Sequence, residues 1–155
     1  NQGVGGCTAT SPQTTWLKSD LASVDSVAQP CIAAFWHQPL WTGGKGSAMV
    51  YQAWWNALYN AQADVVLNGH VHNYQRFDAL SPTGTPDPVN GITEYIVGTG
   101  GEALRSVNST SSPHPVQFAK TFGYLRMTLE ATGWTADFIN ASGTVLDQST
   151  GICHI

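Results

Sequence analysis

The chain has 155 residues, the size of one domain, and this length is enough to bury a core. Hydrophobic residues make up 42% of it, which argues against disorder. The net charge of −4 comes with only six scattered Lys and Arg residues, which argues against a nucleic-acid-binding surface. No apolar run approaches the roughly 20 residues that span a bilayer, so we expect no membrane segment.

The surface composition is typical of secreted proteins. Charged residues are only 10% of the chain, whereas ordinary soluble domains have roughly 25%. Sequons at Asn108 and Asn140 permit N-glycosylation in a eukaryotic host. Because the chain begins Asn-Gln-Gly, with neither an initiator Met nor a signal peptide, we expect a processed or truncated piece of a longer protein.

The three cysteines, Cys7, Cys31 and Cys153, are an odd number. None forms a Cys-x-x-Cys pair, which argues against a zinc knuckle or a thioredoxin-type motif. Cys7 and Cys31 flank a predicted helix, so one expectation is a disulfide between them, formed in an oxidising compartment. Cys153 would then need a partner outside the chain. The alternative is three buried thiols, since free Cys is commonly a small buried hydrophobe.

The first half of the chain predicts a helix and then a strand. Ser11-Pro12 is a typical N-cap and first-turn pair, and apolar residues recur at helical spacing as far as Val24. Cys31–Trp36 is continuously apolar, which predicts a strand buried on both faces. His37–Gly46, rich in Pro and Gly, predicts a loop.

A second helix and more strands follow. Ser47–Ala63 has helical spacing and Asp64–Asn68 predicts another buried strand, so the two strands of this βαβ unit should be parallel and adjacent. After Tyr74 the pattern changes. Gly91–Gly101 predicts a strand ending in a Gly turn, and Phe122–Thr150 alternates with period two, which predicts an antiparallel meander. The order predicts half of a layered α/β fold, with no second domain.

His37 and His70 follow the two predicted parallel strands. The carboxyl ends of such strands meet at one edge, where open α/β sheets place their sites. His72 lies two residues beyond His70, and that spacing in an extended chain turns both imidazoles to one side. Gly69 would let the backbone turn sharply. The pattern therefore predicts convergence of three imidazoles, which are common metal ligands.

Other interpretations stay open. A lone His is more often packed than ligating, and we expect His114 and His154 to be solvated. The Gly-rich segment Val97–Leu104 could bind a phosphate through its backbone, but we expect it to form a turn at the end of a strand. A mononuclear three-His site is a further alternative, against which the helix between His37 and His70 counts. The six Trp residues are compatible with a carbohydrate-binding surface, but packing in the core explains most of them better.

Two motifs carry a resemblance to a known superfamily. "VVLNGHVHNYQRF" (residues 65–77) resembles the Gly-His-x-His signature of the calcineurin-like metallophosphoesterases, which include the purple acid phosphatases. "AAFWHQPLW" (residues 33–41) resembles the preceding strand-His-x-Pro motif. The resemblance covers nearly the whole chain and is closest to secreted bacterial, actinobacterial-type enzymes. It implies the C-terminal half of a four-layer α/β/β/α sandwich.

The resemblance also implies an activity, the metal-dependent hydrolysis of phosphoric esters, by a phosphatase or a phosphodiesterase. Two metal ions, Fe, Zn or Mn, would form the site. His37 and His70 match ligands of the second metal, and His72 matches a ligand of the first. The expected substrate-binding residues at the rim of the cleft are Trp41, Asn73, Tyr74 and Arg76. A surface salt bridge is the alternative for Arg76.

The chain departs from the family because the acidic ligand motifs are absent: neither Gly-Asp nor Gly-Asn-His occurs in it. Asp78, Glu94 and Glu102 match no ligand position. Three neutral imidazoles without a bridging anion should not hold a tight dinuclear centre. We therefore expect the N-terminal half to lie elsewhere, the chain alone to be inactive, and its exposed sheet edge to pair with that half or with another copy.

Overall fold

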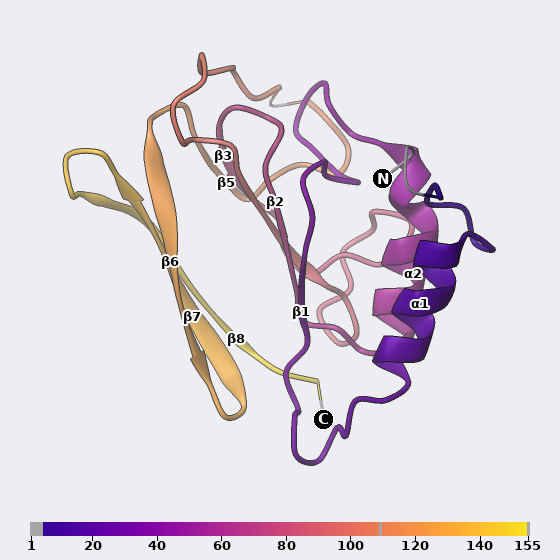
Figure 1. Ribbon diagram of the computed structural model, residues 1–155. Helices are drawn as coiled ribbons and strands as arrows, with labels where there is room; N and C mark the ends of the chain where they lie inside the picture. The colour runs from indigo at the N-terminus through magenta and orange to yellow at the C-terminus, as the bar shows by residue number, and fades with distance from the viewer. Residues whose placement is uncertain (1–4, 109, 155) are drawn as a thin grey trace.

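The computed structural model describes residues 5–108 and 110–154. The chain forms three layers, in which two helices cover one face of a five-stranded sheet and a three-stranded sheet covers the other (Figure 1). One core cluster lies between the helices and the five-stranded sheet, and a second lies between the two sheets. The predicted α/β class is confirmed, while the fourth layer stays a prediction.

The helical layer lies within the predicted spans. α1, Pro12–Leu21, begins after Ser11, whose Oγ accepts a hydrogen bond from the Thr14 N–H at 3.2 Å. A short 3-10 turn, η2 (Met49–Tyr51), leads into α2, Gln52–Asn60. α2 buries Trp55 and Leu58 against the sheet and therefore supplies most of the helical contribution to the core.

The five-stranded sheet has the order β1-β2-β4-β3-β5. Its strands are β1 (Ala33–Phe35), β2 (Val65–Asn68), β3 (Tyr74–Arg76), β4 (Thr93–Val97) and β5 (Gln117–Ala119). β1 and β2 are parallel neighbours, which confirms the predicted βαβ unit. The sequence did not predict β3 and β5, because strands of three residues are too short to show a period.

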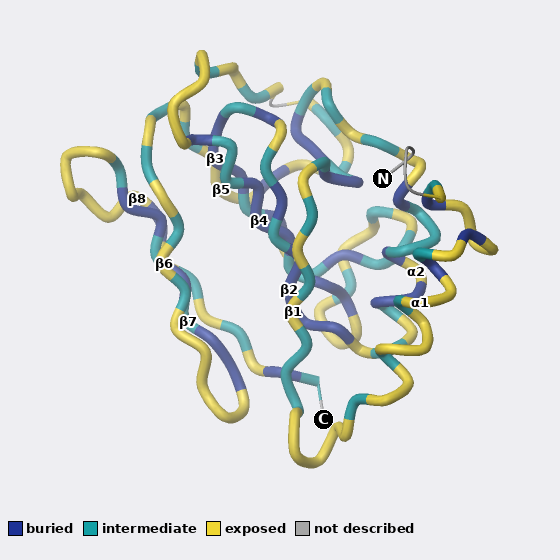
Figure 2. The backbone as a smooth tube through the Cα atoms, in the orientation of Figure 1, coloured by how far each residue is buried: buried dark blue, intermediate teal, exposed yellow. Residues whose placement is uncertain are grey.

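The prediction that the first strand is buried on both faces is wrong. β1 is at the end of the sheet, and Phe35 is 83% exposed. β2 is buried, as its apolar run predicted. Figure 2 shows the contrast between exposed stretches along β1 and the buried centre of the sheet.

The predicted meander is confirmed as β6 (Gly123–Glu130), β7 (Gly133–Asn140) and β8 (Val145–Ile152), paired antiparallel in that order. Alternate residues of β7 point toward the five-stranded sheet. Phe138 is fully buried and its ring stacks on that of Tyr74, with 4.0 Å between the ring centroids and 3° between the planes. This stacking joins the two sheets near the middle of the molecule.

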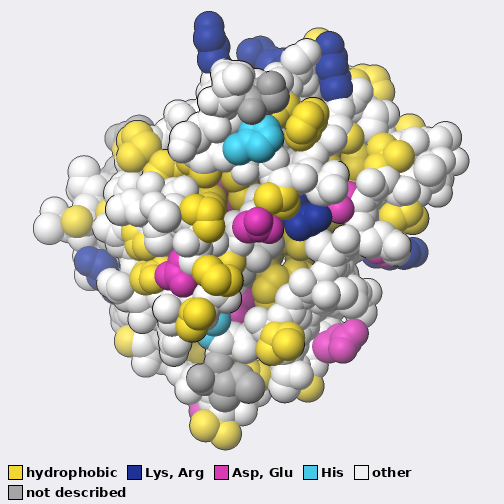
Figure 3. Space-filling view, turned by 180° about the vertical axis from the view of Figure 1, so that it is seen from behind, with side chains coloured by type: hydrophobic (Ala, Val, Ile, Leu, Met, Phe, Trp, Pro, Cys, Tyr) yellow, Lys and Arg dark blue, Asp and Glu magenta, His cyan; other side chains and the backbone are white. Residues whose placement is uncertain are grey.

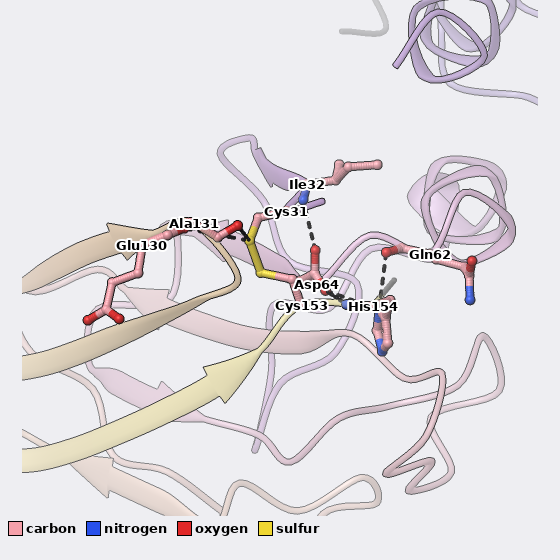
Figure 4. Close-up of a disulfide and its surroundings, with 8 residues drawn as sticks. All are labelled: Cys31, Ile32, Gln62, Asp64, Glu130, Ala131, Cys153 and His154. Atoms are coloured by element: carbon pink, nitrogen blue, oxygen red, sulfur yellow. Dashed lines mark hydrogen bonds and ion pairs between the residues drawn. A yellow bond between two sulfur atoms is a disulfide. The ribbon is translucent and has the colours of Figure 1, made fainter. Parts of the chain in front are cut away.

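A disulfide links Cys31 to Cys153, so the expected Cys7–Cys31 pairing is wrong, and Cys7 is a buried free thiol (Figure 4). Our prediction misjudged the pairing because the C-terminus returns to the start of β1, which local spacing does not reveal. Asp64 lies beside the disulfide and accepts the N–H groups of Ile32 at 2.8 Å and His154 at 2.7 Å. Burial raises the pKa of Asp64, and these two bonds oppose that rise. His154 is therefore held in place and is not merely solvated.

Loss of the disulfide should destabilise the fold by about 3–5 kcal/mol, because it closes a loop between residues 122 positions apart. Thermal unfolding of the Cys31→Ser/Cys153→Ser double variant measures this loss. Adding a reductant should lower the melting temperature of the parent protein and leave that of the double variant unchanged. Equal melting temperatures for the oxidised parent and the double variant would contradict the expectation.

Candidate metal centre

His37 and His70 lie in contact at the carboxyl ends of β1 and β2. Their Nε2 and Nδ1 atoms are 3.3 Å apart, and the two rings meet edge to face with centroids 5.2 Å apart. Both side chains are exposed. Two neighbouring parallel strands thus present two imidazoles to solvent at one point, as the sequence predicted for this pair.

The backbone explains this placement. The Gly69 N–H donates to the His37 carbonyl at 2.9 Å, so the pairing of the parallel strands continues past their ends. The sharp turn expected at Gly69 is made at His70, whose φ of +62° lies in the left-handed region. Few non-glycine residues adopt this conformation, and those that do are concentrated at functional sites. At Gly98, the end of β4 lies so close to this segment that a Cβ would collide with the Val71 carbonyl.

His72 is oriented by a separate contact. Its Nδ1 lies 3.1 Å from the carbonyl oxygen of Ala103. Because a carbonyl only accepts, this contact places the proton on Nδ1 and leaves Nε2 with a free lone pair. Metal-binding histidines are commonly oriented by just such a backbone carbonyl.

The pKa of His70 is lowered, chiefly because partial burial disfavours the charged imidazolium. The neighbouring charges of His37, His72 and Arg105 lower it further. A metal binds the neutral imidazole, so these effects favour the form of His70 that a metal requires.

The donor set fits a transition metal in part. Neutral imidazole suits Zn and Fe, and the His37–His70 pair offers two such donors at one point. Within residues 5–108 and 110–154, however, no group of three or more His, Cys, Asp or Glu side chains lies close enough to hold a metal ion. The structure therefore brings two of the three predicted ligands together, and ligation by all three stays a prediction.

Three of the predicted substrate-binding residues have partners inside the protein. The Tyr74 hydroxyl donates to Asp147 Oδ2 at 2.7 Å, and Arg76 Nε donates to the same oxygen at 2.8 Å. Asn73 is fully buried, with its Nδ2 donating to the Arg105 carbonyl at 3.2 Å. Substrate contact by these side chains stays a prediction, and the geometry favours structural roles for them, including the ion pair that was the alternative for Arg76.

Asp147 holds this internal network together. Burial raises the pKa of its carboxyl, but hydrogen bonds from Arg76 and Tyr74 outweigh burial and leave the pKa below its usual value. Burial and the hydrogen bond to Asp147 raise the pKa of Tyr74. Asp147 is therefore a carboxylate that ties β8 to β3, across the interface between the two sheets.

The tryptophans belong mainly to the core. Trp41, the fourth predicted substrate-binding residue, packs edge to face on Trp55 with ring centroids 6.4 Å apart, and it also packs against the helix-side core. Trp16 is the exception, because its side chain is 65% exposed. One exposed Trp does not make a stacking platform, so the structure gives the carbohydrate-binding alternative no support.

Glu94 is a buried acid that matches no ligand position of the family. It lies on β4 between Ile92 and Ile96, on the face that packs toward the helices, and it is 0% exposed. The backbone amides of Leu40 and Trp41 face its carboxyl, yet neither makes a full hydrogen bond, so both oxygens lack a partner. Burial raises the pKa of Glu94 well above its usual range, and the amides offset this only in part. A lone acid in the apolar run "ITEYIV" was the sequence signal for this residue.

No family model matches the chain. Acid phosphatase A of Cryphonectria parasitica is 32% identical over 154 residues, which cover 91% of this chain and 30% of that protein. Purple acid phosphatase 22 of Arabidopsis thaliana is 36% identical over 125 residues, which cover 76% of this chain and 28% of that protein. The structure of purple acid phosphatase PPD1 from yellow lupin (Lupinus luteus) superposes with a TM-score of 0.80 at 22% identity, covering 91% of this chain and 28% of that chain.

The layered sheets form an α/β fold that this chain shares with the lupin purple acid phosphatase. The chain belongs to the calcineurin-like superfamily and is homologous to the purple acid phosphatases. It spans only about 30% of the length of these relatives. The expected closeness to actinobacterial-type enzymes stays a prediction.

Glu94→Gln should raise stability at neutral pH, and the gain should grow with pH. In the unfolded chain Glu94 ionises above its ordinary pKa of 4.5, whereas the folded chain keeps it protonated to a higher pH. The stability of the parent protein is therefore full below pH 4.5 and falls as pH rises, by at most about 1.4 kcal/mol per pH unit.

Thermal unfolding of the Glu94→Gln variant between pH 4 and 8 checks this expectation. Glu130→Gln, at an exposed position on β6, is the matched control and should follow the parent protein at every pH. A difference between the Glu94→Gln variant and the parent that stays constant with pH would contradict the protonated, buried state of Glu94.

Proposed function

We propose that the chain is part of a metal-dependent phosphoesterase and supplies His37, His70 and His72 as ligands of a dinuclear centre of Fe, Zn or Mn. The observation that carries the proposal is the exposed His37–His70 pair, with 3.3 Å between ring nitrogens, at the carboxyl ends of adjacent parallel strands. When bound, such a centre would lower the pKa of a water molecule and polarise a phosphoryl oxygen. The acid phosphatase names of the homologues support the same reaction class.

The chain's own residues prepare this site. Partial burial lowers the pKa of His70, which favours the neutral imidazole that a metal binds. The Ala103 carbonyl fixes the proton of His72 on Nδ1 and leaves Nε2 as the donor. The tight approach of β4 at Gly98 places this orienting loop beside His72.

The remaining ligands come from polypeptide outside the 155 residues. Part of the support is that the described residues bring no carboxylate to the His37–His70 pair. A second part is the open side of β1, where the exposed Phe35 lies beside an apolar groove of about 540 Å³ lined in part by Trp16 and Leu17. A strand or helix of the rest of the protein would cover this surface.

We also propose that the protein functions in an oxidising compartment, in keeping with secretion. The Cys31–Cys153 disulfide supports this, since such bonds are rare in the cytosol. Asn108, in one of the two sequons, is exposed, and glycosylation of either sequon stays a prediction. Among the described residues no helix is long and apolar enough to cross a membrane.

In the whole protein that contains this chain, His37→Ala or His70→Ala should remove metal and lower kcat for p-nitrophenyl phosphate by about 100-fold or more. Metal content by mass spectrometry and steady-state kinetics measure both effects. His114→Ala is the control, because that exposed imidazole lies on the loop before β5. Unchanged metal content after substitution of His37, His70 and His72 together would refute the proposal.

The 155-residue chain alone, supplied with Zn²⁺, Mn²⁺ or Fe³⁺, should hydrolyse p-nitrophenyl phosphate no faster than the metal solution does. The physical reason is that two imidazoles in contact leave most of the coordination positions of a dinuclear site unfilled. Robust, metal-dependent turnover by this chain would show that the ligand set is complete without further polypeptide.

A further inference from the structure

The loop after β4 lies directly along the histidine segment. The Arg105 N–H donates to the His72 carbonyl at 2.8 Å, and Asn73 Nδ2 donates to the Arg105 carbonyl at 3.2 Å. With the contact between His72 Nδ1 and the Ala103 carbonyl at 3.1 Å, three polar contacts join the two segments. The backbone of Arg105 is therefore fixed beside the candidate metal centre.

The Arg105 side chain is available, whereas the other two arginines are occupied. Arg76 is paired with Asp147 and Arg126 with Asp137. Arg105 is exposed and makes no ion pair with any residue in 5–108 or 110–154. Its side chain starts from a backbone position that hydrogen bonds to His72 and Asn73 fix beside the candidate metal centre.

A guanidinium beside a cation-binding site has an electrostatic consequence. Arg105 repels a metal ion held by the histidines, and no described carboxylate neutralises it. An anion between the guanidinium and the metal would be attracted by both. Figure 3 shows Lys and Arg side chains at the upper end of the molecule.

We propose that Arg105 binds the phosphate group of the ester substrate at this site. The planar guanidinium can donate two parallel hydrogen bonds to two phosphate oxygens, which Lys cannot do. The identity of the substrate as a phosphate ester rests on the proposed function. Anion binding by Arg105 depends only on residues of this chain. The Ala103–Arg105 loop would then have two roles. The Ala103 carbonyl orients His72, and the Arg105 side chain binds the phosphate.

Binding of inorganic phosphate to the whole, metal-loaded protein, measured by titration calorimetry, tests the role directly. Arg105→Gln should weaken phosphate binding by about tenfold or more, with metal content unchanged, and Arg105→Lys should give an intermediate loss. In parallel, KM for p-nitrophenyl phosphate should rise with the phosphate Kd. Arg126→Gln, on the far face of the second sheet, is the matched control and should bind phosphate like the parent protein.

The outcomes separate this inference from the proposed function. A parent protein that binds phosphate but hydrolyses no ester, together with weakened binding by the Arg105→Gln variant, would refute the enzymatic proposal and support the role of Arg105. Equal phosphate Kd values for the Arg105→Gln variant and the parent would overturn that role. Failure of the parent protein to bind phosphate at all would overturn it as well.

Discussion

The parallel pairing of β1 with β2 is the constraint on which the candidate site depends. Phe35 lies opposite Leu67, and the bonding continues beyond the strands through the Trp36 N–H to the Leu67 carbonyl at 3.2 Å. The Gly69 N–H then reaches the His37 carbonyl at 2.9 Å. A shift of one residue in this register would turn every side chain of β1 to the other face and separate His37 from His70. The metal-ligand hypothesis therefore depends on the register of β1 and β2 as well as on the presence of the histidines.

A disulfide and polar contacts at two other places join the parts of the fold. At the end of the sheet away from the histidines, the Cys31–Cys153 disulfide and the Asp64 carboxylate fasten the C-terminus to the start of β1 (Figure 4). Between the sheets, Asp147 joins β8 to Tyr74 and Arg76. These contacts join the C-terminus to the start of β1 and the three-stranded sheet to β3. The candidate site thus lies at the ends of paired strands, and binding sites built on such elements are more precise than sites on loops.

The sequence predicted the parts of the fold whose signal is local and long. The N-cap at Ser11, the βαβ unit and the meander all follow from periodicity and turn residues, and the His37–His70 contact follows from the βαβ unit. The Cys31–Cys153 bond did not follow, because it joins positions that only the complete fold brings together. The exposure of Phe35 was not predicted for a related reason. An apolar run predicts a buried strand, but it does not tell which segment packs on that strand.

The site itself was predicted unevenly. Histidine spacing identified the ligand candidates, but the roles of Asn73, Tyr74 and Arg76 depend on partners such as Asp147, which lies 71 residues beyond Arg76. The sequence did not single out Arg105, because its position beside the histidines depends on three contacts between separate loops rather than on a motif. Long-range pairing of this kind is decided by tertiary packing, which no local pattern encodes.

Anomalous diffraction from crystals of the whole protein, soaked with Zn²⁺ or Mn²⁺, tests the central claim most directly. The account predicts an anomalous peak at about 2.0–2.2 Å from ring nitrogens of both His37 and His70, and a second peak bound by His72 Nε2. Metal peaks at saturation that lie away from all three imidazoles, or none in the cleft at the carboxyl ends of β1 and β2, would contradict it.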